Sequence, residues 1–332
     1  TTNNTSAMKT TLSTLCVLLQ IFLLLLGTPR SCQALASSHS SSPYFAMCVI
    51  VKNEPHLREW IEYHRRMGSS KFYVYDHNNT IPLSRDPSLR KYIDSGLVNI
   101  TRIVGVHQPT TQRYAYQQCV NDHHNKHTFM AFLDTDEYIV VKDKSLKIPD
   151  VLRRYEEYGG LVLFWRQFGS SGHVSRPSGG VLANYNRCVN NYQVKSIANL
   201  QYTTGSGSNP HSMRYKRGYF SVDTARHRCV GPTINATVCN RAKSDPIPAH
   251  LFEVMYINHY FTKSLEEFKA KIERGTISGA KYTLKTFNDL RNATERQSNC
   301  SYLRMPKSTN HPLKQDGQKV RKKMTESAGR EH

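Results

Sequence analysis

The sequence has few acidic residues for its length. Its 332 residues include 25 Asp and Glu against 45 Lys and Arg, which gives a formal net charge of +20. The basic residues are dispersed, apart from a concentration in the tail segment KQDGQKVRKKM, and no zinc-finger or RNA-recognition signature accompanies them. We therefore expect no nucleic-acid partner. The charge serves either to solvate the surface or to attract anionic diphosphates and acidic polysaccharides.

Cysteine pairs with the spacing of zinc ligands are also missing. The eight cysteines contain no C-x-x-C pair, so no zinc site is predicted. Two of the eight lie near the N-terminus, and the others form an even set: Cys48, Cys119, Cys188, Cys229, Cys239 and Cys300. Such a set predicts disulfides in an oxidising compartment. Cys229 and Cys239 flank a Gly-Pro loop and are expected to pair, whereas Cys48 and Cys119 are either paired or simply small buried residues.

No apolar run near the N-terminus is long enough to span a bilayer comfortably. The run from Leu12 to Gly27 falls short of the roughly 20 residues that a span requires. It follows a Met-Lys pair and precedes PRSCQALA, the pattern of a secretory signal that is cleaved near Ala36 or kept as a short anchor. We expect residues 1–42 to comprise leader, signal peptide or signal-anchor, and Ser-rich spacer. Five sequons agree with the secretory pathway, at Asn78, Asn99, Asn235, Asn292 and Asn299.

Strand and helix patterns alternate through most of the remaining chain. Strands are predicted at 45–51, 71–76, 97–104, 128–141 and 160–169, and helices at 55–68, 88–96, 111–122, 148–160 and 264–275. The alternation predicts an α/β fold with a mainly parallel sheet flanked by helices. Residues 170–258 are rich in Gly, Ser, Asn and Tyr, contain short extended pieces, and are expected to be loops that cover a site. The polar, basic tail at 303–332 is expected to be disordered.

Polar residues follow three of the predicted strands. They are Asn53 and Glu54 after the first strand, Asp76 at the end of the second, and the Asp134-Thr135-Asp136 segment inside FLDTDEYIV. In open α/β sheets ligands bind beyond the carboxyl ends of the strands. On an extended chain Asp134 and Asp136 share one side and Glu137 faces away. The two aspartates therefore predict a divalent-cation site with room for a substrate diphosphate, the alternative being an exposed turn with a solvated acid pair.

Six stretches of this chain together resemble glycosyltransferase family 92. They are CVIVKNEPHLREWIEYHRRMG, FYVYDHN, FLDTDEYI, FWRQFGSSGH, VKSI and NHYFTKSLEEFKAKIERG, in order from about residue 46 to 275. The resemblance implies a GT-A nucleotide-diphospho-sugar transferase domain at 43–302, with a loop-rich C-terminal acceptor half. It also implies metal-dependent, inverting transfer of a sugar, often galactose, from a nucleotide-sugar to an oligosaccharide or polysaccharide acceptor. The expected location is the Golgi, as a type II membrane protein held by the N-terminal segment, or outside the cell if that segment is cleaved.

The resemblance also assigns donor and metal residues. Asp134 and Asp136 would hold Mn²⁺ or another divalent cation, with His259 completing the metal shell unless it is a core histidine. The positions of Asn53, Glu54 and Asp76 approach the nucleoside in similar enzymes, although Asp76 also suits a helix cap. Lys195 and Lys263 are either ligands of the diphosphate or surface lysines.

The general base and the acceptor site are less sharply indicated. Candidates for the base are Asp223, His173 and Glu137, with His211 in the same set of loops, and each has a structural role as its alternative. Trp165 and Phe168 could stack on acceptor sugars, with His211 beside them, or could be buried strand aromatics. The alternative function is a catalytically silent or secreted carbohydrate-binding relative.

Overall fold

A computed structural model describes residues 43–104, 110–229, 247–277, 279–297, 300 and 305–306. The expected signal segment at 1–42, Asn235, Cys239 and Asn299 lie outside the described residues, as does nearly all of the basic tail. Within the described part, no helix is both long and apolar enough to cross a membrane.

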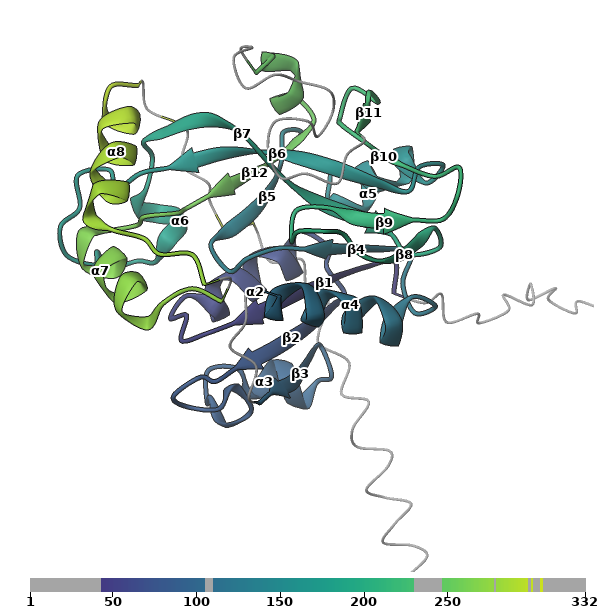
Figure 1. The fold of residues 1–332 in the computed structure, drawn as a ribbon, viewed down its shortest axis with the longest axis horizontal. Coiled ribbons are helices and arrows are strands. Elements are labelled where there is room, and N and C mark those ends of the chain that lie inside the picture. The colour runs from purple at the N-terminus through teal and green to yellow at the C-terminus, as the bar shows by residue number, and fades with distance from the viewer. Residues whose placement is uncertain are drawn as a thin grey trace, which may run out of the picture. The chain divides into compact units, whose positions relative to one another are not determined.

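Four neighbouring strands form the parallel half of the main sheet. They are β1 (Phe45–Val51), β2 (Lys71–His77), β3 (Val98–Ile103) and β4 (Phe129–Phe132). Their order is β3-β2-β1-β4, and each pair is parallel (Figure 1). All seven residues of β1 are buried, as a near-continuous apolar run predicts for a central parallel strand. The carboxyl ends of β1, β2 and β4 therefore meet at one edge.

The other half of the sheet is mixed. It contains β5 (Glu137–Val141), β6 (Gly160–Phe168), β7 (Cys188–Asn199), β10 (Ser221–Val222), β11 (Arg228–Cys229) and β12 (Met255–His259), while β8 (Thr203–Ser206) and β9 (Met213–Tyr215) form a separate hairpin. β7 runs antiparallel to both β4 and β6, whereas β6 pairs parallel with β10 and β12. The α/β architecture with a large, mostly parallel sheet is thus confirmed. The expectation of loops with only short extended pieces in 170–258 is wrong at the 12-residue strand β7. Polar residues such as Lys195 and Ser196 occupy its buried half and obscure the strand pattern.

Helices pack on both faces of β1, as predicted. Met47 and Val49 belong to the core cluster that contains Trp60 of α2 (Leu57–Arg66). Cys48, on the opposite face, belongs to the cluster that contains Tyr116 of α4 (Thr111–His123). Alternation along the strand therefore gives each helix its own half of the core.

The remaining helices are mostly short. They are α3 (Arg90–Asp94), α5 (Ile148–Leu152), α6 (Val181–Asn184), α7 (Leu265–Arg274) and α8 (Leu284–Glu295), with 3₁₀ turns at Leu83–Arg85, Arg153–Tyr155 and Ala249–Phe252. α7 begins with the predicted capping box, in which the backbone N–H of Glu267 donates to Ser264 Oγ at 3.2 Å. It ends at Gly275, whose φ of 68° is the left-handed conformation that glycine adopts freely.

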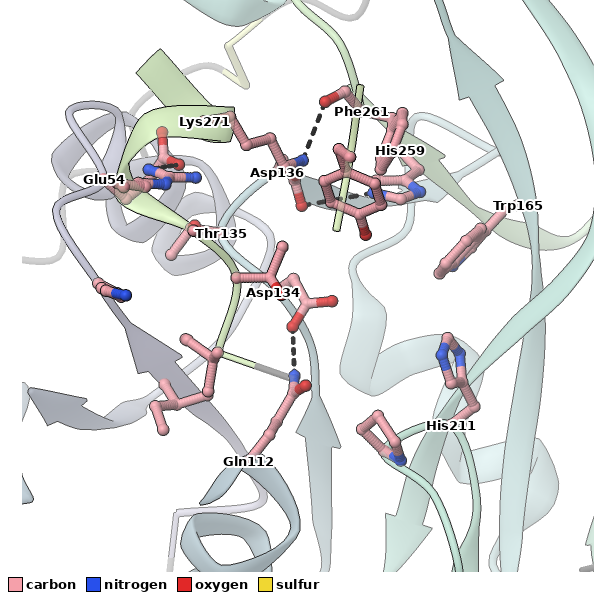
Figure 2. Close-up of a pocket in the computed structure, with 18 of the residues that line it drawn as sticks. Glu54, Gln112, Asp134, Thr135, Asp136, Trp165, His211, His259, Phe261 and Lys271 are labelled. Atoms are coloured by element: carbon pink, nitrogen blue, oxygen red, sulfur yellow. Dashed lines mark hydrogen bonds and ion pairs between the residues drawn. The ribbon is translucent and has the colours of Figure 1, made fainter. Parts of the chain in front are cut away.

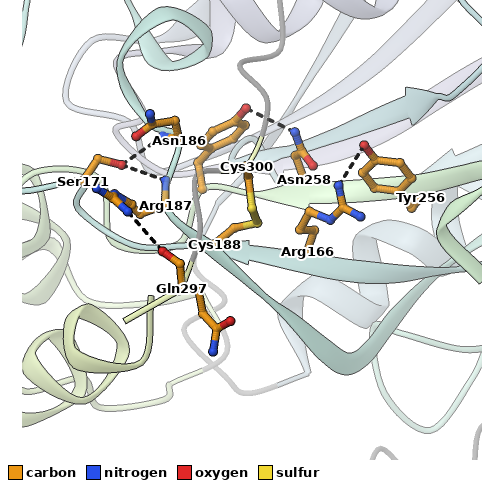
Figure 3. The surroundings of a disulfide bond; sticks show 10 residues. Arg166, Ser171, Asn186, Arg187, Cys188, Tyr256, Asn258, Gln297 and Cys300 are labelled. Carbon is orange, nitrogen blue, oxygen red and sulfur yellow. Dashed lines mark hydrogen bonds between the residues drawn. A yellow bond between two sulfur atoms is a disulfide. The ribbon is translucent and has the colours of Figure 1, made fainter. Parts of the chain in front are cut away.

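One disulfide, Cys188–Cys300, ties residue 300 to the start of β7 (Figure 3). The bond joins positions 112 residues apart in the sequence. Cys229 is also disulfide-bonded, and Cys239, its expected partner, lies outside the described residues. Cys48 and Cys119 are free and buried. Of the two alternatives for this pair, the structure therefore supports small buried core residues and not a disulfide.

Candidate active site

The segment FLDTDEYIV is a tight turn between two strands. β4 ends at Phe132 and β5 begins at Glu137, and the backbone N–H of Glu137 donates to the carbonyl of Asp134 at 3.1 Å. The backbone N–H of Asp134 in turn donates to Glu137 Oε2 at 2.8 Å. The prediction of one continuous extended segment is therefore wrong here. Because the chain turns, Glu137 does not face away from Asp134 but closes the turn beneath it.

A buried lysine fixes the first acid of the turn. Lys195 on β7 is fully buried, and its Nζ lies 2.8 Å from Asp134 Oδ2 and 3.5 Å from Glu137 Oε2. Gln112 of α4 donates from Nε2 to the other oxygen of Asp134 at 2.5 Å. The Asp134 side chain is 37% exposed, so it remains open to the cavity described below.

The pKa shifts of these three groups describe one ion pair beside a neutral acid. Burial raises the pKa of Asp134, but the charge of Lys195 outweighs burial and holds the pKa below its usual range. Burial lowers the pKa of Lys195, and the negative charge of Asp134 more than reverses this. Burial raises the pKa of Glu137 well above its usual range; the charge of Lys195 lowers it, but not enough to reverse the shift, and the charge of Asp134 raises it further.

The second acid, Asp136, contacts a lysine and a histidine from other elements. Lys271 of α7 donates to Asp136 Oδ2 at 2.9 Å, and His259 Nε2 lies 3.5 Å from Oδ1. Burial raises the pKa of Asp136, and Lys271 and His259 together bring it well below the usual value. Burial lowers the pKa of His259, which favours its neutral form.

Both aspartates line one cavity of about 350 Å³ (Figure 2). One wall is aromatic: the Trp165 ring centroid lies 4.1 Å from that of His259 and 5.4 Å from that of His211. Trp165 Nε1 and His259 Nδ1 are buried and have no hydrogen-bond partner among the described residues.

The opposite side of the cavity is basic. Lys52 follows β1, and Lys271 and Arg274 lie one turn apart on α7. Arg274 Nη1 donates to Glu54 Oε2 at 3.1 Å and to the carbonyl of Asn53 at 2.9 Å. The sequence analysis missed these three cations. The signal that could have found Lys271 and Arg274 is their spacing of three residues on one face of a well-predicted helix.

The cavity thus combines convergent acids, cations and an aromatic wall at the carboxyl ends of parallel strands. A family model, glycosyltransferase family 92, matches residues 44–236, which is more than half of the chain. The chain belongs to glycosyltransferase family 92. Similar family 92 proteins are found in Arabidopsis thaliana (28% identical, covering 69% of this chain and 37% of the relative) and in Oryza sativa subsp. japonica (28% identical, 42% and 24%). A third, from Ricinus communis, is 26% identical over 42% of this chain and 25% of its own length.

This family 92 chain therefore spans well under half the length of the relatives it matches. The longest of these matches covers 241 residues. The family model's match over 44–236 includes the acidic turn.

The donor set of the family 92 cavity suits a divalent cation, although the ligands are not assembled around one. Asp134, Asp136 and His259 line the same cavity and offer oxygen and nitrogen donors. Among the described residues, no group of three or more His, Cys, Asp or Glu side chains is arranged to hold a metal ion. Instead Lys195 and Lys271 neutralise the two aspartates. A cation would therefore compete with an ammonium group at each carboxylate.

Two of the predicted nucleoside contacts have internal roles. Asp76 is buried, and its carboxylate accepts hydrogen bonds from the backbone N–H groups of Asn79 and Leu83, at 3.2 and 2.8 Å. Asn53 adopts a positive φ of 46°, and its side-chain oxygen accepts from the N–H of Thr80. Neither lines the cavity with the aspartates, because both brace the loop after β2. Glu54 does line it.

The cavity does not include several other predicted residues. Lys263 is buried against Glu54, with Nζ 3.1 Å from Oε1, and Phe168 is fully buried, with its ring centroid 4.5 Å from that of Tyr260. Asp223 accepts the N–H groups of its own turn, and His173 Nε2 bonds to the carbonyl of Asn184 at 3.1 Å. Local bonds thus occupy both loop candidates for the base. Trp165, His211 and His259 are brought together, as described above.

Proposed function

We propose that this chain is a metal-dependent, inverting glycosyltransferase of GT-A fold. It moves galactose from UDP-galactose to an oligosaccharide or polysaccharide acceptor in the Golgi lumen. The observation that carries the proposal is the pairing of Asp134 and Asp136 in one cavity with Lys52, Lys271 and Arg274. Two acids with adjacent cations suit a diphosphate and its counterion, because each charge of the ligand meets an opposite one.

Asp134, Asp136 and His259 would hold Mn²⁺, with oxygen and nitrogen donors of the kind that this ion accepts. The bound ion supplies Lewis-acid stabilisation of the charge on the leaving diphosphate. Lys271 and Arg274 on α7 line the same cavity and would place positive charge beside the leaving diphosphate.

The aromatic wall suits the sugar rings. Trp165 is 8% exposed, and that exposed surface lines the cavity, where the C–H face of a sugar can stack. Trp165 thus offers a stacking surface to the transferred sugar or to the acceptor.

The test is a transfer assay with the full chain, produced in a secretory host. UDP-sugars are screened with Mn²⁺ and a β-1,4-galactooligosaccharide, and transfer is expected from UDP-galactose and to cease with EDTA. Asp136→Asn is expected to lose at least about 100-fold in rate, because removing even an outer-shell partner of a metal site typically costs about 10- to 100-fold. Asp289→Asn is the matched control, because this aspartate is 62% exposed on α8. Unchanged turnover in Asp136→Asn would refute the metal site, and glycan binding without turnover would favour a silent relative.

A further inference from the structure

His211 is held rigidly at the edge of the cavity. It follows Pro210 in the segment between β8 and β9, and both residues line the cavity. The ring nitrogen Nδ1 lies 2.7 Å from the carbonyl oxygen of Val194. The backbone of His211 is fixed as well, because its N–H donates to Asn209 Oδ1 at 2.8 Å and its carbonyl accepts from Ser196 Oγ at 2.8 Å.

This bond determines which ring nitrogen carries the proton. A carbonyl oxygen can only accept, so Nδ1 must be the donor and must carry hydrogen. In a neutral imidazole the other nitrogen, Nε2, then has a lone pair. No described residue donates to Nε2, so this lone pair is available to a ligand in the cavity.

The other side chains of the cavity that could accept a proton already form ion pairs. Glu54 forms ion pairs with Lys263 and Arg274, both at 3.1 Å. Asp134 and Asp136 contact Lys195 and Lys271 and are the acids proposed to hold the cation. His259 lies beside Asp136 and shares that role. Among the described residues that line this cavity, His211 is the one histidine or carboxylate that forms no ion pair.

We infer that His211 is the catalytic base of the transfer, accepting the proton of the acceptor hydroxyl at Nε2. This inference rests on the proposed glycosyltransferase function and assigns the base within it. A lone pair of the hydroxyl oxygen forms the bond to the anomeric carbon as the bond from that carbon to the diphosphate oxygen breaks. The electron pair of the broken bond leaves with the nucleoside diphosphate. The hydroxyl proton moves to Nε2 and gives an imidazolium.

The surroundings of His211 keep the ring neutral and Nε2 unprotonated. Burial, and then the charge of Lys195 on β7, lower the pKa of His211 to about 4, so the ring is neutral near pH 7. Asp134 in the acidic turn raises that pKa and His259 on β12 lowers it. The adjacent Trp165 ring would hold a stacked acceptor next to Nε2.

Two variants and one spectroscopic measurement test the assignment. His211→Asn keeps an N–H donor near Val194, so the fold and donor binding should persist. Its kcat with UDP-galactose and the galactooligosaccharide is expected to fall by about 10²- to 10⁴-fold, the usual contribution of a general base, with KM for the donor within about threefold. In His211→Ala, added imidazole is expected to restore part of the rate. His124→Asn is the matched control, because His124 makes the same type of Nδ1-to-carbonyl contact, to Asn121 at 3.1 Å, at the exposed C-terminal end of α4.

The spectroscopic measurement is the ¹⁵N NMR spectrum of His-labelled protein at pH 7, with the His211→Asn variant used for assignment. An Nδ1–H tautomer of His211 is expected. An Nε2–H tautomer or an imidazolium would overturn the inference, whatever the activity. A normal kcat in His211→Asn would overturn it too and leave the proposed function standing. Absence of transfer by the wild-type chain would overturn both.

Discussion

Replacing Lys195 with methionine tests the ion pair that fixes the acidic turn. Methionine preserves the length of the side chain but removes its charge, leaving Asp134 without the ammonium 2.8 Å away. Removing one partner of a buried ion pair costs about 3–5 kcal/mol. Because the Asp134 side chain is 37% exposed, water screens part of the uncompensated charge. We therefore expect the free energy of unfolding to fall by about 2–3 kcal/mol, near the value of a charge-assisted hydrogen bond.

The assay is thermal and urea unfolding of the wild type and the variant. For a domain of this size, such a loss lowers the melting temperature by about 4–12 °C. The control is Lys285→Met, whose partner Asp289 lies 2.8 Å away but on the surface, with side chains 81% and 62% exposed, so its expected cost is at most about 0.5 kcal/mol. Adding Asp134→Asn to Lys195→Met should recover part of the loss, because no charge is then left unpaired. A cost of Lys195→Met equal to that of Lys285→Met would refute the reasoning.

Two further predictions concern the disulfide and the response to acid. Cys300→Ser removes the bond to Cys188 and is expected to cost about 2–5 kcal/mol of unfolding free energy, because it frees a long loop in the unfolded chain; an unchanged melting temperature would contradict this. His64 is buried, bonds through Nδ1 to the carbonyl of Trp60, and accepts the N–H of Ile139 at Nε2. Burial lowers its pKa to about 3, so below about pH 6.5 the unfolded chain takes up a proton that the folded chain does not. The free energy of unfolding should therefore fall as the pH drops from 6.5 towards 5, by up to about 1.4 kcal/mol per pH unit from this residue. Urea unfolding at pH 7.5, 6.5 and 5.5 should show a shallower slope for His64→Gln, and equal slopes would rule the assignment out.

The parallel half of the sheet could be predicted because each of its strands is a short apolar run that can be recognised on its own. Phe45–Val51 and Phe129–Phe132 are apolar runs whose residues are buried on both faces, and such runs need no knowledge of their neighbours. Polar residues follow the same strands. Their placement at one edge of the sheet was therefore predictable, and Glu54 and Asp136 do line one cavity there. The capping box of α7 could be predicted for the same reason, because Ser264 and Glu267 are only three residues apart.

The parts that could not be predicted depend on contacts between distant residues. Lys195 lies 61 residues from Asp134, and Lys271 lies 135 residues from Asp136. Nothing in the sequence next to a lysine says whether it is on the surface or buried against an acid. The direction in which Glu137 points depended on a two-residue turn, because one bend reverses the alternation that an extended chain would impose.

The two lysines are not equivalent in how easily they could yield to a cation. Lys195 is fully buried, and both of its acidic neighbours belong to the turn, so displacing it would leave an unpaired ammonium in the core. Lys271 also donates to the carbonyl of Phe261 at 3.0 Å and lies 4.3 Å from that residue's ring, with 12% of its side chain exposed at the cavity. If it left Asp136, it would keep these partners and remain at the cavity. Exchange of an ammonium for the proposed metal ion would therefore cost less at Asp136 than at Asp134, which makes Asp136 the acid whose substitution best tests the proposed metal.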